Sequence, residues 1–158
     1  MRETMGFFKA GDTISGQEAR AFITIDGRVE PLFYAKNLEA TAKKKKTEIK
    51  TLGHRGTQHK ANGWSGEGRM TVYYATSLFR ELMIKYMKTG VDTYFHIQVT
   101  NEDPTSSIGA QTVLLKDCNL DSVVLASFDV DADVLEEDVD FTFSDADLLE
   151  KFKKPTLG

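Results

Sequence analysis

The chain has 158 residues, of which 41% are hydrophobic and 28% are charged, and its formal net charge is −4. This length and composition are those of a soluble globular protein that can bury a core, so we expect one domain over residues 1–158. The single cysteine, Cys118, excludes an internal disulfide and argues against a small secreted scaffold. We expect no signal peptide and no membrane-crossing segment, because no apolar run is long enough for either.

The charges are sorted along the chain. Residues 1–60 hold 12 Lys and Arg against 7 Asp and Glu, whereas residues 117–150 hold 12 acidic residues and no Lys or Arg. Such asymmetry is typical of a nucleic-acid or membrane patch, or of complementary surfaces that meet between copies of one protein.

The first predicted elements are strands. Residues 18–26 alternate apolar and polar side chains, which favours a strand, and Asp26-Gly27 suits the tight turn of a hairpin. Residues 28–35 are the returning strand, with Pro31 marking an edge or a bulge. Residues 37–53 alternate less clearly and predict a hairpin with the lysine run 43–46 near its tip.

Residues 53–68 hold five glycines and almost no aliphatic side chains. This composition predicts a long loop, with Trp64 as its one large anchor. Long ordered loops in small domains are often functional.

One helix is predicted after a strand over residues 68–75. Its apolar residues recur at helical spacing, between Thr76 or Ser77 as N-cap and Gly90 as C-cap. We expect the apolar stripe to pack on a sheet as core. The stripe consists of Leu78, Phe79, Leu82, Met83, Tyr86 and Met87.

The remaining segments again alternate with period two. We expect strands over residues 92–100, 111–120, 122–134 and 139–145, with a loop at 101–109 and a turn around 119–121. About eight strands and one helix predict a mainly β (α+β) fold, an antiparallel β-sandwich or barrel with one flanking α-helix. Residues 1–12 and 149–158 are expected to be an N-terminal arm and a C-terminal tail.

Carboxylates at alternate positions are the most distinctive pattern. Strand spacing places one group of aspartates on one face of a strand and a second group on one face of the next strand. Because like charges on paired strands repel, something must compensate for these aspartates, and we expect the compensation to lie outside a single isolated copy of the chain. These residues are Asp129, Asp131, Asp133, Asp138 and Asp140.

The sequence contains no complete residue pattern for a metal site, a cofactor site or a catalytic site. The aspartates match the start of an EF-hand loop, but Val134 stands where its glycine belongs and no helices flank it. His54 and His59 lack a third residue that would complete a metal site. A phosphate-binding loop leads into a helix N-terminus, whereas the glycines here lead into a strand. No nucleophile and base can be paired, so we expect neither a cofactor nor an enzyme.

Several segments in order carry a resemblance to a known family. They are GHRGTQHKANGWSGEGRMTVYY (53–74), TSLFRELMIKYMKTG (76–90), DTYFHIQV (92–99) and LDSVVLASFDVDADVLEEDVDFTFSD (120–145). Together, over residues 12–148, the chain resembles the tail tube protein of contractile phage tails in the PBSX-like group, which includes defective prophages and tailocins.

The resemblance implies a structural protein that forms stacked hexameric rings, a hollow tube in the virion tail made in the host bacterial cytoplasm. Sheath, baseplate or tail initiator, and tape-measure proteins would be its partners, and DNA or ions would pass without specific binding. The alternatives are the tube of a related injection or secretion system and, from another class, a β-barrel that binds a small ligand.

Two roles for the carboxylates stay open: a negative lumen wall that repels phosphate, or a junction between subunits that pairs with lysines. The lysine run itself is either a solvated hairpin tip or a contact for an acidic partner, and nucleic-acid binding is disfavoured by a pI near 5.4. The candidate contacts between subunits are Lys43, Lys44, Lys45, Lys46, Arg55, His59, Lys60 and Trp64.

Overall fold

The computed structural model describes residues 9–32 and 34–155. The chain forms two compact units, one from residues 9–32, 94–117 and 145–155, and the other from residues 34–93 and 118–144. Strand β6 (Ala110–Ser122) contributes its first part to one unit and its last residues to the other. Whether the chain is one domain, as expected, stays a prediction.

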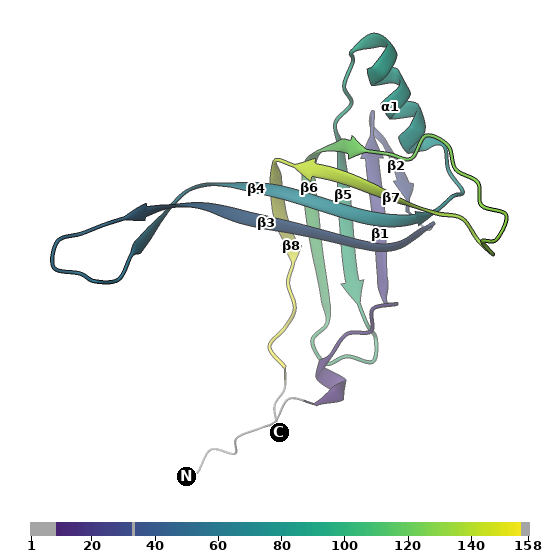
Figure 1. The fold of residues 1–158 in the computed structure, drawn as a ribbon. Helices are drawn as coiled ribbons and strands as arrows, with labels where there is room; N and C mark the ends of the chain where they lie inside the picture. The colour runs from purple at the N-terminus through teal and green to yellow at the C-terminus, as the bar shows by residue number, and fades with distance from the viewer. Residues whose placement is uncertain (1–8, 33, 156–158) are drawn as a thin grey trace. The chain divides into compact units, whose positions relative to one another are not determined.

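The first unit is an antiparallel sheet in which β2, β1, β5 and β6 are hydrogen-bonded in that order and β8 pairs with β6 (Figure 1). Asp26 and Gly27 both have positive φ, 49° and 77°, and place Ile25 opposite Arg28, which confirms the predicted hairpin. Ile23, Phe95 and Ile97 are buried in its core. Its elements are η1 (Ala10–Asp12), β1 (Ala19–Ile25), β2 (Arg28–Pro31), β5 (Phe95–Glu102) and β8 (Asp145–Glu150).

The second unit is an antiparallel sheet in the order β6, β7, β4, β3, together with the helix α1. Met70, Val72, Val139 and Phe141 are fully buried on one face of the sheet, as the period-two pattern predicts. Its elements are β3 (Ala35–Ile49), β4 (Gln58–Tyr73), α1 (Leu78–Thr89) and β7 (Glu136–Phe143).

Eight antiparallel strands and one α-helix in the described part of the chain confirm the predicted mainly β class. The hydrogen-bonded order among the described residues ends at β2 and at β3, so the sheet is not closed into a barrel. The barrel alternative is therefore wrong.

The helix begins and ends where its caps predict. Ser77 is the N-cap, and Gly90, with φ 72°, ends the helix by donating its N–H to the Tyr86 carbonyl at 2.8 Å. Of the predicted core stripe only Phe79 is buried, whereas Tyr86 and Met87 are 50% and 61% exposed. The expectation that the whole stripe is core is wrong, because Leu82 and Met83 are only half-buried and α1 is exposed beyond Met83.

The predicted loop 53–68 is mostly strand, since β4 begins at Gln58. Its glycines have structural roles that composition does not reveal. Gly66 and Gly68 lie opposite Phe143 and Phe141 across the β4–β7 pair, and the two aromatic rings lie over the missing side chains. Glycine here makes room for a neighbour's ring.

The lysine run lies along β3 and not at the hairpin tip, which is formed by residues 50–57. The expected turn at 119–121 is also absent from the described chain, because β6 continues to Ser122. Of the strand predicted over residues 122–134, residues 123–134 are irregular, and β8 was not predicted.

A buried ion pair fixes the first turn of α1 to β7. The Arg80 guanidinium lies 2.5 Å from the Glu137 carboxylate and 4.2 Å above the Tyr74 ring, and Glu137 is only 2% exposed. Arg80 also donates to the carbonyl of Thr76. A cation on the helix and an anion on the strand are thus paired away from water through Oε2 of Glu137, while its Oε1 is buried without a hydrogen-bond partner in the described chain.

Replacing Arg80 by Met should destabilise the fold by about 3–5 kcal/mol, because Glu137 would stay buried without its cation. The double change Arg80→Met with Glu137→Met should recover most of that loss. Lys36→Met, which removes the Lys36–Glu136 pair next along β7, should cost far less, because both partners of that pair are exposed to solvent. Urea unfolding measures all three, and equal losses from Arg80→Met and Lys36→Met would contradict the assignment.

Gly68→Ala should destabilise the fold by roughly 1–3 kcal/mol, because the new methyl would overlap the Phe141 ring. Gly66→Ala should behave likewise, since its methyl would lie 2.5 Å from Phe143. Gly16→Ala is the matched control, with nothing within 4 Å of the added carbon. Thermal unfolding that ranks Gly16→Ala with the other two would overturn this packing argument.

Candidate interaction surfaces

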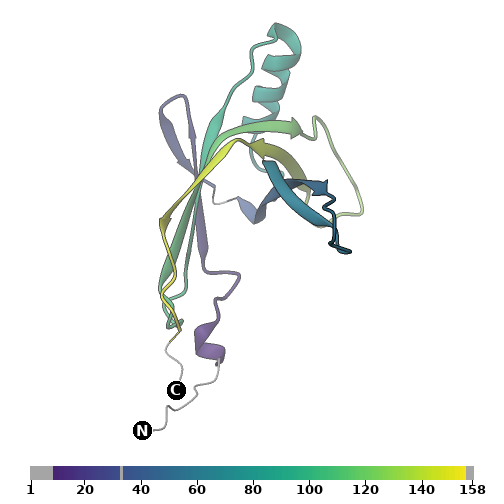
Figure 2. The same cartoon turned by 90° about the vertical axis from the view of Figure 1, so that its left-hand side faces the viewer.

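A two-stranded arm projects from the second unit (Figures 1 and 2). Strand β4 pairs with β7 only from Gly66 to Tyr73, so within the described chain its residues 58–65 pair with β3 alone. We call residues 43–65 the basic arm. All its residues up to Trp64 are exposed.

The basic arm has a defined internal geometry. A register shift between Lys44 and Lys46 sets Lys45 against two residues of β4, Asn62 and Gly63, and the φ of 135° at Gly63 suits glycine in this bulge. The Asn62 amide donates to the Thr47 hydroxyl at 2.7 Å across the strands. The arm is thus a shaped ribbon and not an irregular loop.

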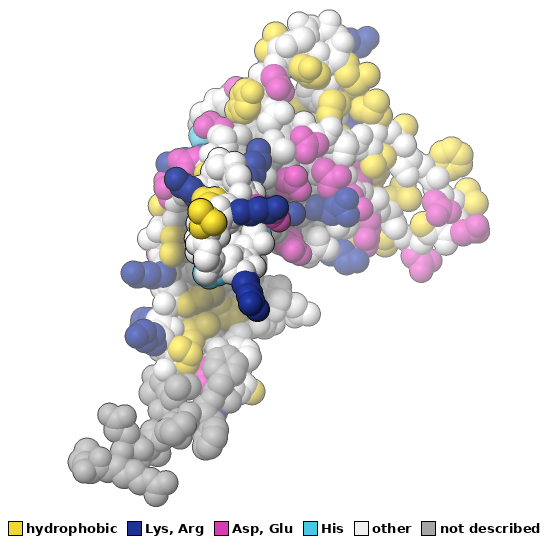
Figure 3. Space-filling view, turned by 60° about the vertical axis from the view of Figure 1, so that its left-hand side comes forward, with side chains coloured by type: hydrophobic (Ala, Val, Ile, Leu, Met, Phe, Trp, Pro, Cys, Tyr) yellow, Lys and Arg dark blue, Asp and Glu magenta, His cyan; other side chains and the backbone are white. Residues whose placement is uncertain are grey.

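The basic arm gathers most of the candidate contact residues. It holds seven Lys or Arg and one acidic residue, and Figure 3 shows Lys and Arg side chains grouped on it. Leu52 at its tip is fully exposed. Trp64 lies at its base, with its ring centroid 5.9 Å from that of Phe143 in the same subunit. The cations the structure brings together on the arm are Lys43, Lys44, Lys45, Lys46, Lys50, Arg55 and Lys60.

The outer face of the second unit's sheet carries a polar groove of about 620 Å³, which we call the acidic groove. Its four carboxylates surround one cation, Arg69. The lining residues are Asn37, Glu39, Thr41, Glu67, Gly68, Arg69, Asp121, Asp140 and Phe141.

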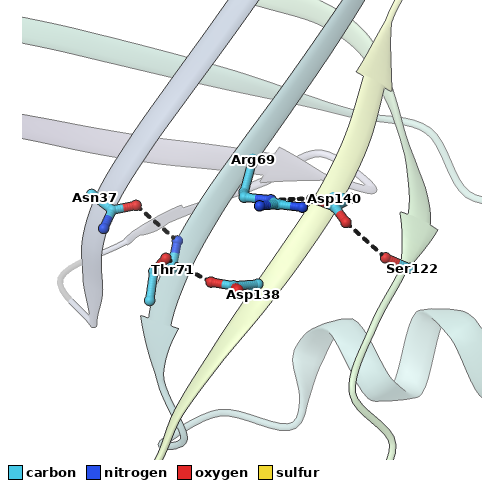
Figure 4. A network of polar contacts seen from close by, with 6 residues as sticks. All are labelled: Asn37, Arg69, Thr71, Ser122, Asp138 and Asp140. Atoms are coloured by element: carbon cyan, nitrogen blue, oxygen red, sulfur yellow. Dashed lines mark hydrogen bonds and ion pairs between the residues drawn. The ribbon is translucent and has the colours of Figure 1, made fainter.

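Polar contacts cross four strands, β3, β4, β7 and β6, at this groove (Figure 4). The Arg69 guanidinium donates to Asp140 at 2.7 Å, and the Ser122 hydroxyl donates to the same carboxylate at 3.0 Å. The Thr71 hydroxyl donates to Asp138 at 2.7 Å. Asp138 and Asp140 share the outer face of β7, as predicted, but Asp140 is compensated within its own subunit, contrary to the expectation.

Two carboxyl groups of the groove have pKa values shifted in opposite directions. The hydrogen bond from Arg69, with a further one from Ser122, lowers the pKa of Asp140. Burial raises the pKa of Asp121, and the charges of Asp140 and Glu67 raise it further. One arginine therefore leaves the groove with an excess of negative charge.

The other predicted aspartates lie on residues 123–135, which we call the acidic segment. Asp129 caps a turn by accepting the N–H of Asp131 at 3.0 Å, so the expected strand face of Asp129, Asp131 and Asp133 is wrong. Phe128 and Val130 are 88% and 89% exposed. The segment presents carboxylates and uncovered apolar side chains together.

Sequence reasoning missed the groove's other members, Glu39, Glu67, Arg69 and Asp121. The alternation of Glu67 and Arg69 along GEGRMTV was a usable signal, but the glycines directed the interpretation to a loop.

Within residues 9–32 and 34–155, no three His, Cys, Asp or Glu side chains are grouped as metal ligands. No helix in this part of the chain has the length and apolar content to cross a membrane.

These features define a class: a mainly antiparallel β protein whose exposed arm, segment and groove are the kind of charged surfaces that subunits of an assembly use to contact one another. Residues 6–150 match the family described as phage tail tube protein, and the chain belongs to that family. The resemblance seen in the sequence is confirmed.

Relatives and solved structures agree with this placement. The chain is 46% identical over 143 residues to "Phage-like element PBSX protein XkdM" of Bacillus subtilis (strain 168), covering 90% of this chain and 95% of the relative. The fold is similar to a chain of the anti-feeding prophage baseplate, with a TM-score of 0.64, 11% identity and coverage of 87% and 95%. It is also similar to a chain of an extracellular contractile injection system, the PVC sheath–tube complex, with a TM-score of 0.59, 11% identity and coverage of 82% and 87%.

Arg69→Gln should raise the pKa of Asp140 toward its ordinary value, because the carboxylate would lose its charged donor. In the wild type, the lowered pKa means that this pair stabilises the fold fully above the unfolded aspartate pKa, and the contribution is lost as the pH falls through the lower folded pKa. Carboxyl NMR titration checks this order, with Asp121 titrating above Asp140. An unchanged Asp140 pKa in the variant would contradict it.

Proposed function

We propose that this protein is the tube subunit of a contractile tail and assembles into stacked hexameric rings around a channel. The observation that carries the proposal is the basic arm. A two-stranded ribbon with all but one of its residues exposed is marginal alone in water and gains stability from a neighbouring surface. Membership of the tail tube family supports another tube subunit as that neighbour.

In this role the protein is structural, with no catalytic step and no cofactor. It would be made in the host bacterial cytoplasm and reside in the tail of a phage, a defective prophage or a tailocin. Sheath, baseplate or tail initiator, and tape-measure proteins would be its partners. The similar fold in the anti-feeding prophage and PVC particles supports a second candidate, the tube of an injection system.

We further propose that the acidic groove, with Asp138 and Asp140, faces the channel. Six copies per ring would surround it with uncompensated carboxylates, because each groove holds one cation for four acids. DNA phosphates would be repelled from such a wall instead of captured. Passage then requires no specific contact.

The purified protein at high concentration should form rings or tubes visible by negative-stain electron microscopy. Reconstruction of these tubes should show sixfold symmetry and the acidic groove toward the channel. A protein that stays monomeric across concentration, salt and added tail initiator would contradict tube formation. Tubes with the groove turned outward would refute the lumen assignment alone.

A further inference from the structure

We infer that the basic arm of one copy docks on the acidic segment of the next copy. This inference rests on the proposed function, and it names the two surfaces that would join the subunits. The occupant of the acidic segment is thus a second copy of this chain.

The two surfaces lie at opposite ends of one strand. The basic arm contains the first half of β4, up to residue 65. At the other end of β4, Tyr73 pairs with Glu136, and Tyr74 donates its N–H to the carbonyl of Leu135, the last residue of the acidic segment. The paired stretch from Gly66 to Tyr73 separates them by about 25 Å at strand spacing.

The two surfaces therefore do not meet within one copy (Figure 1). A contact between them joins the end of one subunit to the opposite end of another. Such a head-to-tail contact uses unlike surfaces and closes into a ring or extends into a stack, according to the rotation between copies.

The basic arm and the acidic segment carry opposite charges. The basic arm has seven Lys or Arg and a single acidic residue, Glu48, whereas the acidic segment has three Asp and no Lys or Arg. Opposite charges on facing surfaces steer association and set the register. Like surfaces of two copies repel each other, which disfavours arm-to-arm and segment-to-segment contacts.

Both the basic arm and the acidic segment carry apolar side chains that are exposed to solvent. Ile49 and Leu52 are exposed on the basic arm, and Phe128, Val130 and Val134 are exposed on the acidic segment. The acidic groove also attracts cations, but Phe141 is the single large apolar residue among its lining residues, and its Asp140 is already bound by Arg69. The arm's combination of charge and apolar side chains matches the segment better than the groove.

Cysteine cross-linking tests the contact directly, because the native Cys118 is fully buried. A tagged Leu52→Cys chain is mixed with an untagged Val130→Cys chain under assembly conditions and oxidised. We expect a mixed dimer in this pair. The matched control replaces Val130→Cys by Asp121→Cys, which places the thiol in the acidic groove, and we expect little cross-linking there. Cross-linking to Asp121→Cys in preference to Val130→Cys would overturn the inference.

Charge reversal provides a second readout. Lys44→Glu with Lys45→Glu should raise the concentration needed for assembly by roughly tenfold or more, as expected for loss of close charge pairs. Assembly should be restored when a second chain that carries Asp131→Lys with Asp133→Lys is mixed in. It should also be restored when these two changes are made in the same chain as the lysine changes. Lys151→Glu with Lys154→Glu, exposed but outside the arm, is the control and should change little.

The outcomes separate this inference from the proposed function. Tubes that form in the wild type without the Leu52–Val130 cross-link and without rescue by charge reversal would leave the tube function standing and refute the docking. A wild type that forms no assembly under any condition would refute both.

Discussion

The second unit depends on how strand β4 is paired, because the two halves of this strand have different partners. From Gly66 to Tyr73 it is held between β3 and β7, with the rings of Phe141 and Phe143 seated over glycines. Before Gly66 the support of β7 ends and the strand continues into the arm. The aromatic rings on β7 thus mark the boundary between the buried sheet and the ribbon that projects from it.

The charge asymmetry of the sequence becomes three separate surfaces in the fold. Cations concentrate on the arm, carboxylates with an arginine form the groove, and carboxylates with apolar neighbours form the segment. The buried Arg80–Glu137 pair is different, because it holds the helix to β7 and shows no net charge to a partner. Only part of the acidic C-terminal region is thus available for contacts between chains.

Patterns confined to a short stretch of sequence predicted several elements correctly. The Asp26-Gly27 hairpin, the caps of α1 and the alternating strands β1, β5 and β7 follow from such patterns. The glycine-rich strand did not, because Gly66 and Gly68 are explained by phenylalanines more than 70 residues away. Residues 123–135 alternate like a strand, yet a strand requires a partner, and Asp129 instead caps a turn. The groove could not be predicted either, because its lining residues come from four strands that are distant from one another in the sequence.

An arm at one end of β4 and an acceptor at the other give each subunit a direction. In a stack joined through these surfaces, every interior arm is covered, while one terminal ring keeps its arms bare and the opposite terminal ring keeps its acceptors bare. The two ends of such a tube are chemically unlike, one basic and one acidic. A capping protein for one end could not serve the other, and growth from an initiator would proceed with a single polarity.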